Sequence, residues 1–429
     1  MNSHLCNRCG SCVGLSEGAI EFIDREGKYY PKIVKALHDE QVEKIYHACS
    51  GKYFDFPRYR ELFYPDTTNF HTYTGPYEKI GIGHAVDPDL RINAASGGII
   101  TTSLIYLLKT GKIDGAVTTR MNPKVPWQAE AFIATTREEI IESAQSKYCI
   151  TSVNEILPQM EAFKGKLAYV GIPPQVQSIR KLQEVNDPSV KNIEYIFGPF
   201  YGNTLHFTSV KALLRSYKVK DFTQITKLYF RHGEWPGNMR VELKSDKVIE
   251  LKKFHANYLI PFYILKNSLF CTDLANEFTD LSVGDAWAPV YEERGKGFSL
   301  ILTRNNKGQN LLNEMINAGW LNFEEITENE AISMHSHGYD LKKRGAFIRI
   351  RLRKLFGKPV PDYGYELKDF PLSRYLMEYI ISFMFLVLGT WPARRFIGLF
   401  SPEFVGKFFE KARTLWKKSS YKIKRADLH

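Results

Sequence analysis

Four cysteines in the first 49 residues are the side chains whose spacing most directly indicates chemistry. Two residues separate Cys6 from Cys9 and Cys9 from Cys12, and the fourth is Cys49. Soft thiolates select zinc or iron-sulfur clusters. Structural zinc usually draws on two separated pairs of ligands, whereas three thiolates from one loop and a remote fourth suit a cubane cluster. We therefore predict one 4Fe-4S cluster bound by Cys6, Cys9, Cys12 and Cys49, with zinc and unliganded thiols as the alternatives.

Other arrangements of the cysteines fit less well. A two-cluster bacterial ferredoxin continues its run to a fourth cysteine followed by proline, and this sequence has Ser16 and Glu17 there. Cys149 and Cys271 stand alone, and a free buried cysteine is more often a small hydrophobic residue than a ligand. Six cysteines in 429 residues are too few for a disulfide scaffold. Reduced thiols and a cytoplasmic location follow.

Three glycine-rich turns are candidate binding loops. Ser96-Gly97-Gly98, with Thr101 one turn further on, lies where a loop is expected to enter a helix. Main-chain N–H groups at such a point can hold a phosphate or the polar edge of a flavin, although the same residues also form an ordinary helix N-cap. Gly171–Gln175 and Gly284–Trp287 form two further loops of this kind.

The elements that position these loops read as an α/β (mixed α+β) fold, because apolar strand-like runs alternate with helical patterns. The predicted elements are a helix over 98–108, strands over 113–118 and 167–170, a helix over 175–182, a strand over 194–197 and a helix near 205–215. We expect three parts: a small iron-sulfur (ferredoxin-like) segment over 1–75, an α/β catalytic body over 76–338, and a basic, aromatic helical tail over 339–429.

The charge of +11 is uneven, because eight Lys and Arg and no acid lie between Leu341 and Lys358. The apolar run Tyr379–Leu388 is about half of the roughly 20 residues that a membrane span needs. Basic residues interleaved with aromatics around Arg394 to Trp416 are typical of a helix in a membrane surface; the alternative is a helical pair packed on the body.

No nucleic-acid motif is present, so no nucleic-acid partner is expected. Met1–Leu5 shows no secretory signal.

Taken in order, these residues resemble the beta-subunit family of the deazaflavin (coenzyme F-420) hydrogenases and dehydrogenases. The resemblance passes through Cys6–Cys12, Tyr30-Pro31, Arg91, Ser96–Gly98, Gly115, Ser146–Tyr148, Gly171–Gln175, Arg231, Trp235–Gly237, Asp273, Asp280 and Gly284–Trp287. It implies FAD beside iron-sulfur clusters, with a deazaflavin as a possible co-substrate. It also implies a redox partner, either a protein such as ferredoxin or a reduced cofactor.

The resemblance also implies roles for single residues. The residues expected to contact the flavin or line its pocket are Ser96, Gly97, Gly98, Thr101, Ser146, Lys147, Tyr148 and Arg231. Lys147 and Tyr148 are the candidate catalytic residues. The charge of Lys147 would favour a reduced, anionic flavin, and its alternative is a surface lysine. Arg231 would face a phosphate or pair with an acid.

One departure from the family concerns a further cluster in the body. The resemblance implies that relatives place its cysteines at the positions of Pro174, Tyr201, Ser268 and Cys271. Three of these four residues are not cysteines, and tyrosine or serine replaces thiolate poorly. We therefore predict that the second cluster is missing.

Two functions remain open on this reading. The first is an iron-sulfur flavoprotein oxidoreductase that acts on an organic substrate, and the second is a non-catalytic electron-transfer subunit that docks onto another enzyme. The resemblance further implies a link to polysaccharide building, and the tail would suit the inner face of a membrane.

Overall fold

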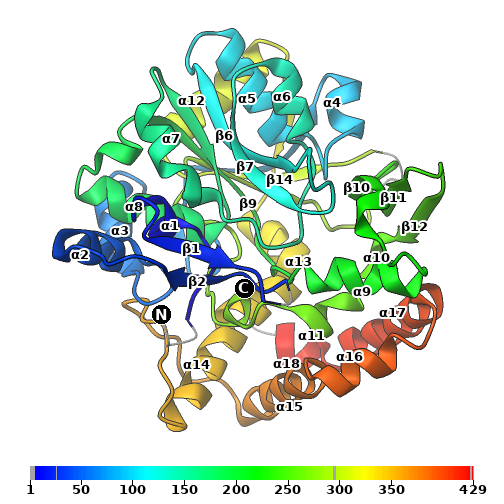
Figure 1. The fold of residues 1–429 in the computed structure, drawn as a ribbon. Helices are drawn as coiled ribbons and strands as arrows, with labels where there is room; N and C mark the ends of the chain where they lie inside the picture. The colour runs from blue at the N-terminus through cyan, green and yellow to red at the C-terminus, as the bar shows by residue number, and fades with distance from the viewer. Residues whose placement is uncertain (1–4, 26, 293–295, 426–427, 429) are drawn as a thin grey trace.

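The structure is a computed structural model that describes residues 5–25, 27–292, 296–425 and 428. Most of Met1–Leu5, on which the expectation about a secretory signal depends, lies outside the described residues. An eight-stranded mixed sheet forms the centre (Figure 1). Its order is β15 (Leu321–Glu325), β5 (Lys79–Ala85), β14 (Ser299–Thr303), β13 (Leu281–Asp285), β9 (Ile193–Pro199), β8 (Leu167–Val170), β6 (Gly115–Met121) and β7 (Ala129–Ala134).

The four strands β13, β9, β8 and β6 run parallel to one another, and the outer pairs are antiparallel. Parallel strands are apolar on both faces because helices cover both sides. On one face Ala116, Ala168 and Phe197 join one core cluster, and on the other Val117, Tyr169 and Ile196 join a second. The carboxyl ends of these strands are the edge where α/β proteins bind ligands.

Helices and a small sheet surround this centre. The body helices are α4 (Pro88–Ile92), α5 (Ile99–Lys109), α6 (Arg137–Glu142), α7 (Leu157–Ala162), α8 (Pro173–Glu184), α9 (Thr208–Ser216), α10 (Lys253–Ala256), α11 (Leu259–Tyr263), α12 (Asn306–Asn317) and α13 (Glu328–Tyr339). A three-stranded antiparallel sheet consists of β10 (Ile225–His232), β11 (Asn238–Leu243) and β12 (Val248–Lys252). The predicted α/β body is confirmed, and β8 matches the expected strand residue for residue.

The N-terminal segment packs against α8 and a short 3-10 helix at Val153–Ile156. Its elements are α1 (Ser11–Gly14), β1 (Ile20–Ile23), β2 (Tyr30–Ile33), α2 (Asp39–Ala48), α3 (Phe56–Phe63), β3 (Asn69–His71) and β4 (Gly75–Tyr77). The Ser11 and Ser178 hydroxyls lie 2.6 Å apart, and the Asn154 N–H donates to the Cys9 carbonyl at 2.9 Å. A Cβ on Gly10 would lie 2.5 Å from the Glu155 nitrogen, so glycine permits this close approach.

The basic stretch after Leu341 turns inward. It forms a π-helical turn at Asp340–Arg344 and then α14 (Gly345–Leu355). Lys343 forms an ion pair with Glu277, and both side chains are fully buried. The Lys342 ammonium donates to the Ser268 carbonyl at 2.7 Å. Part of the charge that the sequence concentrates here, including that of Lys343 and Arg349, is therefore neutralised inside the protein.

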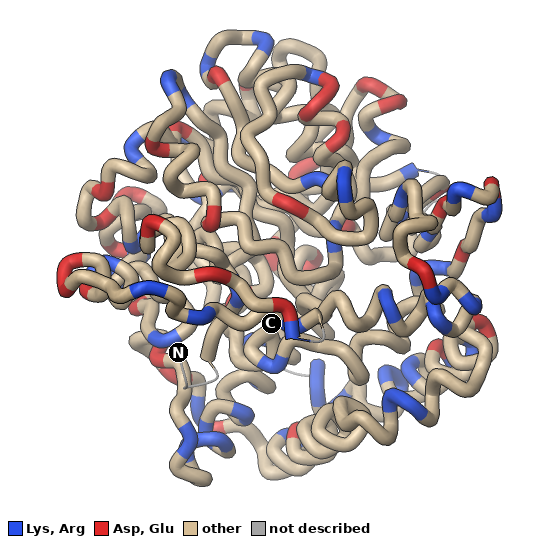
Figure 2. The backbone as a smooth tube through the Cα atoms, in the orientation of Figure 1, with Lys and Arg blue, Asp and Glu red and all other residues tan. Residues whose placement is uncertain are grey.

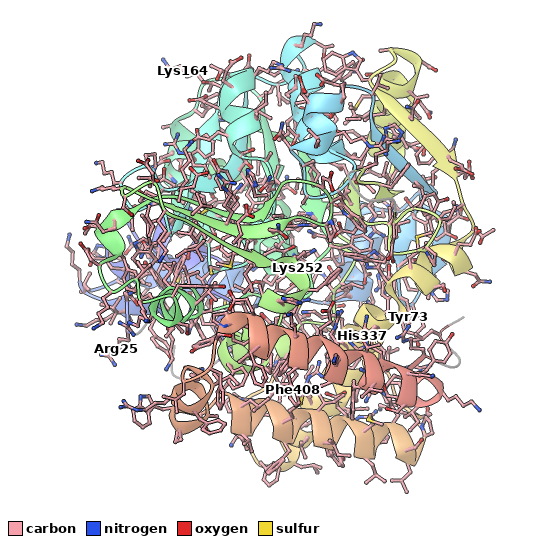
Figure 3. All side chains as sticks on the ribbon, turned by 90° about the vertical axis from the view of Figure 1, so that its right-hand side faces the viewer. Arg25, Tyr73, Lys164, Lys252, His337 and Phe408 are labelled. Carbon is pink, nitrogen blue, oxygen red and sulfur yellow. The ribbon has the colours of Figure 1, made fainter. Side chains whose placement is uncertain are left out.

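The tail is helical, as the sequence predicts, and forms α15 (Leu372–Leu388), α16 (Trp391–Ile397), α17 (Pro402–Ser419) and α18 (Tyr421–Arg425). These helices lie along the lower edge of the molecule (Figures 1 and 3). Within the described residues no one helix has the length and apolar character of a membrane span, but α15 and α16 together do, with a bend of 76° between them. The predicted boundaries at 75/76 and 338/339 stay predictions.

Candidate functional site

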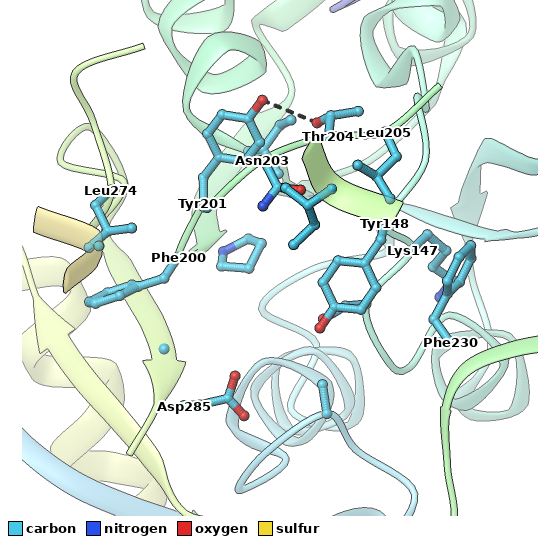
Figure 4. A pocket seen from close by; sticks show the side chains of 18 of the residues that line it. Lys147, Tyr148, Phe200, Tyr201, Asn203, Thr204, Leu205, Phe230, Leu274 and Asp285 are labelled. Carbon is cyan, nitrogen blue, oxygen red and sulfur yellow. Dashed lines mark hydrogen bonds between the residues drawn. The ribbon is translucent and has the colours of Figure 1, made fainter. Parts of the chain in front are cut away.

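A cavity of about 950 Å³ opens at the carboxyl ends of the parallel strands (Figure 4). Gly171 after β8, Pro199 at the end of β9 and Asp285 at the end of β13 all line it. Its volume lies at the upper end of the roughly 300–1,000 Å³ that small-molecule and cofactor sites occupy. The fold therefore places a cofactor-sized cavity where an α/β sheet is expected to bind ligands.

Ser96 and Gly98 of the Ser96-Gly97-Gly98 turn line the cavity, together with Thr101, whereas Gly97 packs against Gly83 and Ser299. The Ser96 hydroxyl lies 2.7 Å from that of Ser299, which also accepts the Gly97 N–H at 2.8 Å. Gly98 has φ +80°, a conformation that favours glycine, and it begins α5. The first residues of α5 line the cavity, so N–H groups at a helix N-terminus are available for an anionic group.

Lys147 lines the cavity and binds the end of α6. Its ammonium donates to the carbonyls of Ser143, Ala144 and Gln145, the last two at 2.8 and 3.2 Å. Burial lowers the pKa of Lys147 to about 7, against the opposing charge of Glu142. The ammonium is thus held by main-chain carbonyls, and its action on a flavin stays a prediction.

Tyr148 reaches into the cavity with its hydroxyl toward Asp285 (Figure 4). Its ring packs edge-on against Phe230, with 5.8 Å between centroids. Burial raises the pKa of Tyr148, but the positive charges of Lys253 and Arg231 outweigh it and hold the pKa below the usual value. A tyrosine with a lowered pKa in a cavity is a candidate for proton transfer or for binding an anionic transition state.

Arg231 joins two of the loops that the sequence singles out. Its guanidinium donates to both carboxylate oxygens of Asp285, at 3.0 and 3.2 Å, and to the Pro236 carbonyl at 2.9 Å. The Trp235 indole N–H donates to Asp285 at 3.1 Å. The acid that pairs with Arg231 is therefore Asp285, and a contact with a cofactor phosphate stays a prediction.

The four N-terminal cysteines form one group. Each thiol is partly buried and unbonded to another cysteine. Burial raises the pKa of Cys12, and the charges of Cys9, Cys6 and Cys49 raise it further, so the four thiols are near enough to interact electrostatically. The Arg8 N–H donates to the Cys6 sulfur at 3.4 Å, and the Gly51 and Lys52 N–H groups point to Cys49. Main-chain donors of this kind are suited to ligating thiolates.

No three His, Cys, Asp or Glu side chains in the described ranges converge on a position for a single metal ion. A cubane cluster makes a different demand, because it presents a separate iron atom to each of four thiolates. The donor set of Cys6, Cys9, Cys12 and Cys49 fits that group chemically. Their ligation of a cluster stays a prediction.

The cysteine loop and the cavity are neighbours. Asn7 and Arg8, between the first two cysteines, line the cavity. On the same side, the Gln175 amide donates to the Thr151 carbonyl at 2.7 Å, and the Asn154 amide donates to the Ser11 hydroxyl at 2.9 Å. Hydrogen bonds thus fix the cysteine loop against the cavity wall.

Two of the body positions at which relatives are expected to hold a second cluster, Tyr201 and Ser268, carry side chains that contact each other. The Tyr201 and Ser268 hydroxyls lie 2.6 Å apart. The Lys342 ammonium lies 4.2 Å from the centre of the Tyr201 ring, and the Cys271 thiol donates to the Asp273 carbonyl at 3.6 Å.

Sequence reasoning missed Lys253 and His335, which also line the cavity. The His335 imidazole contacts the Asp285 carbonyl at 2.7 Å, and the Lys253 ammonium lies 5.1 Å from the Trp287 ring. Neither stands in a recognisable motif. Only the Gly284–Trp287 loop, flagged by its glycine and acid, pointed to this part of the site.

A mixed α/β body with a cavity at the carboxyl ends of its parallel strands is typical of cofactor-binding α/β proteins. Residues 82–158 match the profile of the coenzyme F420 hydrogenase/dehydrogenase beta subunit N-terminal region, and residues 164–329 match that of its C terminus. The chain belongs to the coenzyme F420 hydrogenase/dehydrogenase beta-subunit family, which consists of oxidoreductase subunits.

Individual relatives are distant. The chain is 25% identical to the coenzyme F420-dependent sulfite reductase of Methanocaldococcus jannaschii over 80% of its own length, but it spans only 51% of that protein. It is 27% identical to the coenzyme F420 hydrogenase subunit beta of Methanococcus voltae, over 67% of this chain and 99% of that one. A chain in the F420-reducing NiFe hydrogenase complex of Methanosarcina barkeri has a similar fold, with TM-score 0.55, 20% identity, and coverage of 68% of this chain and 98% of that one.

Proposed function

We propose that the chain is an iron-sulfur flavoprotein oxidoreductase subunit. It passes electrons between an external donor, one 4Fe-4S cluster, FAD and an organic substrate. The observation that carries this proposal is a shared cavity: the loop between Cys6 and Cys9 lines it, and so do the Ser96–Thr101 and Ser146–Tyr148 segments. The donor is a deazaflavin, ferredoxin or a similar carrier, and coenzyme F420 is named in several relatives.

The residues present fit both groups. When bound, a flavin supplies hydride or single-electron exchange, and a cluster supplies one electron at a time. The N-terminus of α5 offers N–H donors to an anionic group. Lys147 fixes the loop that carries Tyr148, and Tyr148 can hold or release a proton at its hydroxyl. The Arg231–Asp285 pair fixes the opposite wall.

The proposal assigns one cluster only. Tyr201, Ser268 and the buried Lys342 fill the second position with mutual contacts. Of the four positions, only Cys271 could supply a thiolate, so the ligands of an additional cluster are lacking. Electrons would then pass directly between the N-terminal cluster and the cavity.

A non-catalytic electron-transfer subunit is the second candidate. It is favoured by the similarity in fold to a chain of a hydrogenase complex and by the beta-subunit names of the relatives. The two functions differ in the isolated chain. An oxidoreductase reoxidises its bound flavin when substrate is added, whereas a docking subunit copurifies with a partner and shows no such reoxidation.

The tail supports a peripheral position at the inner face of a membrane. Between Trp391 and Arg425 the sequence has ten Lys and Arg against two Glu. Large apolar side chains are exposed on the tail helices, among them Phe383 of α15, Trp391 of α16 and Phe408 of α17 at 66%, 67% and 66%. This combination is typical of helices that lie in an anionic membrane surface. The link to polysaccharide building stays a prediction.

Anaerobic purification tests the redox proposal. We expect about four irons per chain and flavin released on denaturation. Cys9→Ser should remove essentially all the iron and leave the flavin bound. Cys271→Ser is the matched control, because that thiol is buried and hydrogen-bonded outside the cysteine group. Iron without flavin in the parent protein would refute the flavoprotein proposal, and iron lost equally from both variants would refute the assigned ligands.

A further inference from the structure

The cavity extends beyond the residues shared with the family. The matched ranges end at residue 329, yet one wall of the cavity comes from the tail helices α15 and α17. Ile381 and Phe385 of α15 and Phe409 and Trp416 of α17 line it. The redox end and the tail end therefore belong to one continuous space, and the tail end lies outside the residues that the family profiles match.

Four positive side chains gather at the tail end: Arg413 and Lys417 of α17, and Lys424 and Arg425 of α18. Lys424 lies 3.5 Å from Asp340, and Arg425 contacts the Ser336 hydroxyl at 3.4 Å. In the part of the chain that the structure describes, neither Arg413 nor Lys417 is in an ion pair.

The acids near this group do not balance it. Glu292 lies at the cavity wall and is exposed, while Glu410 lies 3.2 Å from the imidazole of His255. Burial and the charges of Arg413, Arg425 and Lys424 together lower the pKa of Lys417 to about 8, against the opposing charge of Glu292. Like charges held together without a counter-charge reduce stability. A ligand that supplies negative charge would offset this cost.

The outer face of the same helix is apolar. Phe404, Phe408 and Leu415 are 62%, 66% and 69% exposed, at helical spacing along α17 (Figure 3). Lys and Arg are spaced among them (Figure 2). A helix with cations on its cavity side and exposed aromatics and lysines on its outer side can line a ligand site and also lie against a membrane surface.

We propose that the tail end of the cavity binds the phosphoryl group of an amphipathic ester, whose apolar chain lies along Phe385, Phe409 and Trp416. Arg presents forked donors that match phosphate oxygens, and a phosphate or diphosphate carries more charge than one carboxylate. The source is a lipid phosphate in a membrane or a soluble phosphate ester. An amphipathic phosphate ester would then be the substrate class of the proposed oxidoreductase. The binding site itself does not depend on that proposed function, but the assignment of its ligand as the substrate does.

Calorimetric titration tests the site with three probes: farnesyl diphosphate, inorganic diphosphate and farnesol. We expect farnesyl diphosphate to bind more tightly than either of the others. Arg413→Gln with Lys417→Gln should weaken its binding roughly tenfold to a hundredfold, because two charge-assisted bonds are lost. Lys411→Gln with Lys418→Gln changes the net charge equally on the outer face of α17, and we expect it to bind like the parent.

Each outcome is decisive. Equal binding of farnesyl diphosphate by the parent and the cavity variant would overturn the site, and equal binding of the two diphosphates would overturn the role of the apolar chain. The cavity variant should melt no lower than the parent, because it relieves like-charge repulsion.

Sedimentation with phosphatidylcholine vesicles, with and without phosphatidylglycerol, tests the membrane source. If the outer-face variant alone loses vesicle binding, the ligand comes from a membrane. If the parent protein does not bind vesicles, the source is a soluble phosphate ester. Flavin and iron contents report separately on the proposed function.

Discussion

Replacing Asp285 with asparagine removes the charge that compensates Arg231. The Arg231 side chain is 2% exposed and donates to both oxygens of Asp285, at 3.0 and 3.2 Å. Removing one partner of a buried pair costs roughly 3–5 kcal/mol, because a charge is left buried without compensation. Asp285 keeps 20% exposure, and an asparagine oxygen still accepts one bond. We therefore expect the free energy of unfolding to fall by about 2–3 kcal/mol.

The same change has a second, spectroscopic effect. The Asp285 carboxylate raises the pKa of Tyr148, whereas Lys253 and Arg231 lower it. Asp285→Asn should therefore lower the pKa of Tyr148 further, and Arg231→Met should raise it. The pH titration of phenolate absorbance measures both shifts, with Tyr148→Phe in each background to identify the signal. Two variants with opposite signs distinguish this electrostatic effect from a general loss of structure.

Urea unfolding measures the stability change. Glu242→Gln is the control, because Glu242 pairs with Arg240 at 2.9 Å on the small sheet, and both side chains are 27% exposed. An exposed pair of this kind contributes about 1 kcal/mol or less. Equal losses in Asp285→Asn and Glu242→Gln, or a Tyr148 pKa that rises in Asp285→Asn, would refute the reasoning.

Three further predictions concern other parts of the chain. Wild-type protein should gain stability relative to Tyr148→Phe as the pH rises toward about 10, because the folded pKa of Tyr148 lies below that of the unfolded chain; parallel urea series at several pH values measure this, and a constant difference would contradict it. Gly97→Ala should lower flavin content and stability, since its Cβ would lie 2.5 Å from the Gly83 carbonyl, whereas the Cβ of Gly398→Ala, at the end of α16, meets only ordinary contacts at 3.4 Å and should change neither. Lys343→Met leaves the buried Glu277 without one of its two cations and should cost about 3 kcal/mol near neutral pH. Lys343 and Arg60 outweigh burial in lowering the pKa of Glu277, so the stability lost in Lys343→Met should become smaller as falling pH protonates Glu277 in the variant. Calorimetric melts at two pH values measure this loss, and a loss that grows at the lower pH would contradict the prediction.

Local patterns predicted the order of elements well. Leu167–Val170 is apolar and flanked by turn residues, so its strand was evident from sequence, and the helix that follows begins at Pro173, a residue favoured in the first turn. The pairing of β13 with β9 and of β14 with β5 could not be predicted, because each joins residues far apart in the chain. The order of strands in a sheet depends on packing of the whole body, not on local periodicity.

The site shows the same division. The cysteine spacing marked the N-terminal group, whose four thiols interact electrostatically in the structure, and their binding of a cluster stays a prediction. The partner of Arg231 could not be chosen from sequence, because any of the acids in the chain satisfied the pattern until folding selected Asp285. Lys342 and Lys343 belong to the basic stretch of the sequence, yet both are fully buried. Their acceptors, Ser268 and Glu277, lie some 70 residues away and leave no local trace.

The two faces of α17 tie the cavity to the exterior of the protein. Trp416 lines the cavity while Leu415, its neighbour in sequence, is exposed outside. Because α17 forms both an inner wall of the cavity and an outer face of the protein, binding of a ligand in the cavity and binding of a surface outside belong to one thermodynamic cycle. If a surface bound outside raises the affinity of the cavity for its ligand, the ligand must raise the affinity for that surface by the same factor. Any such coupling would pass through a single helix.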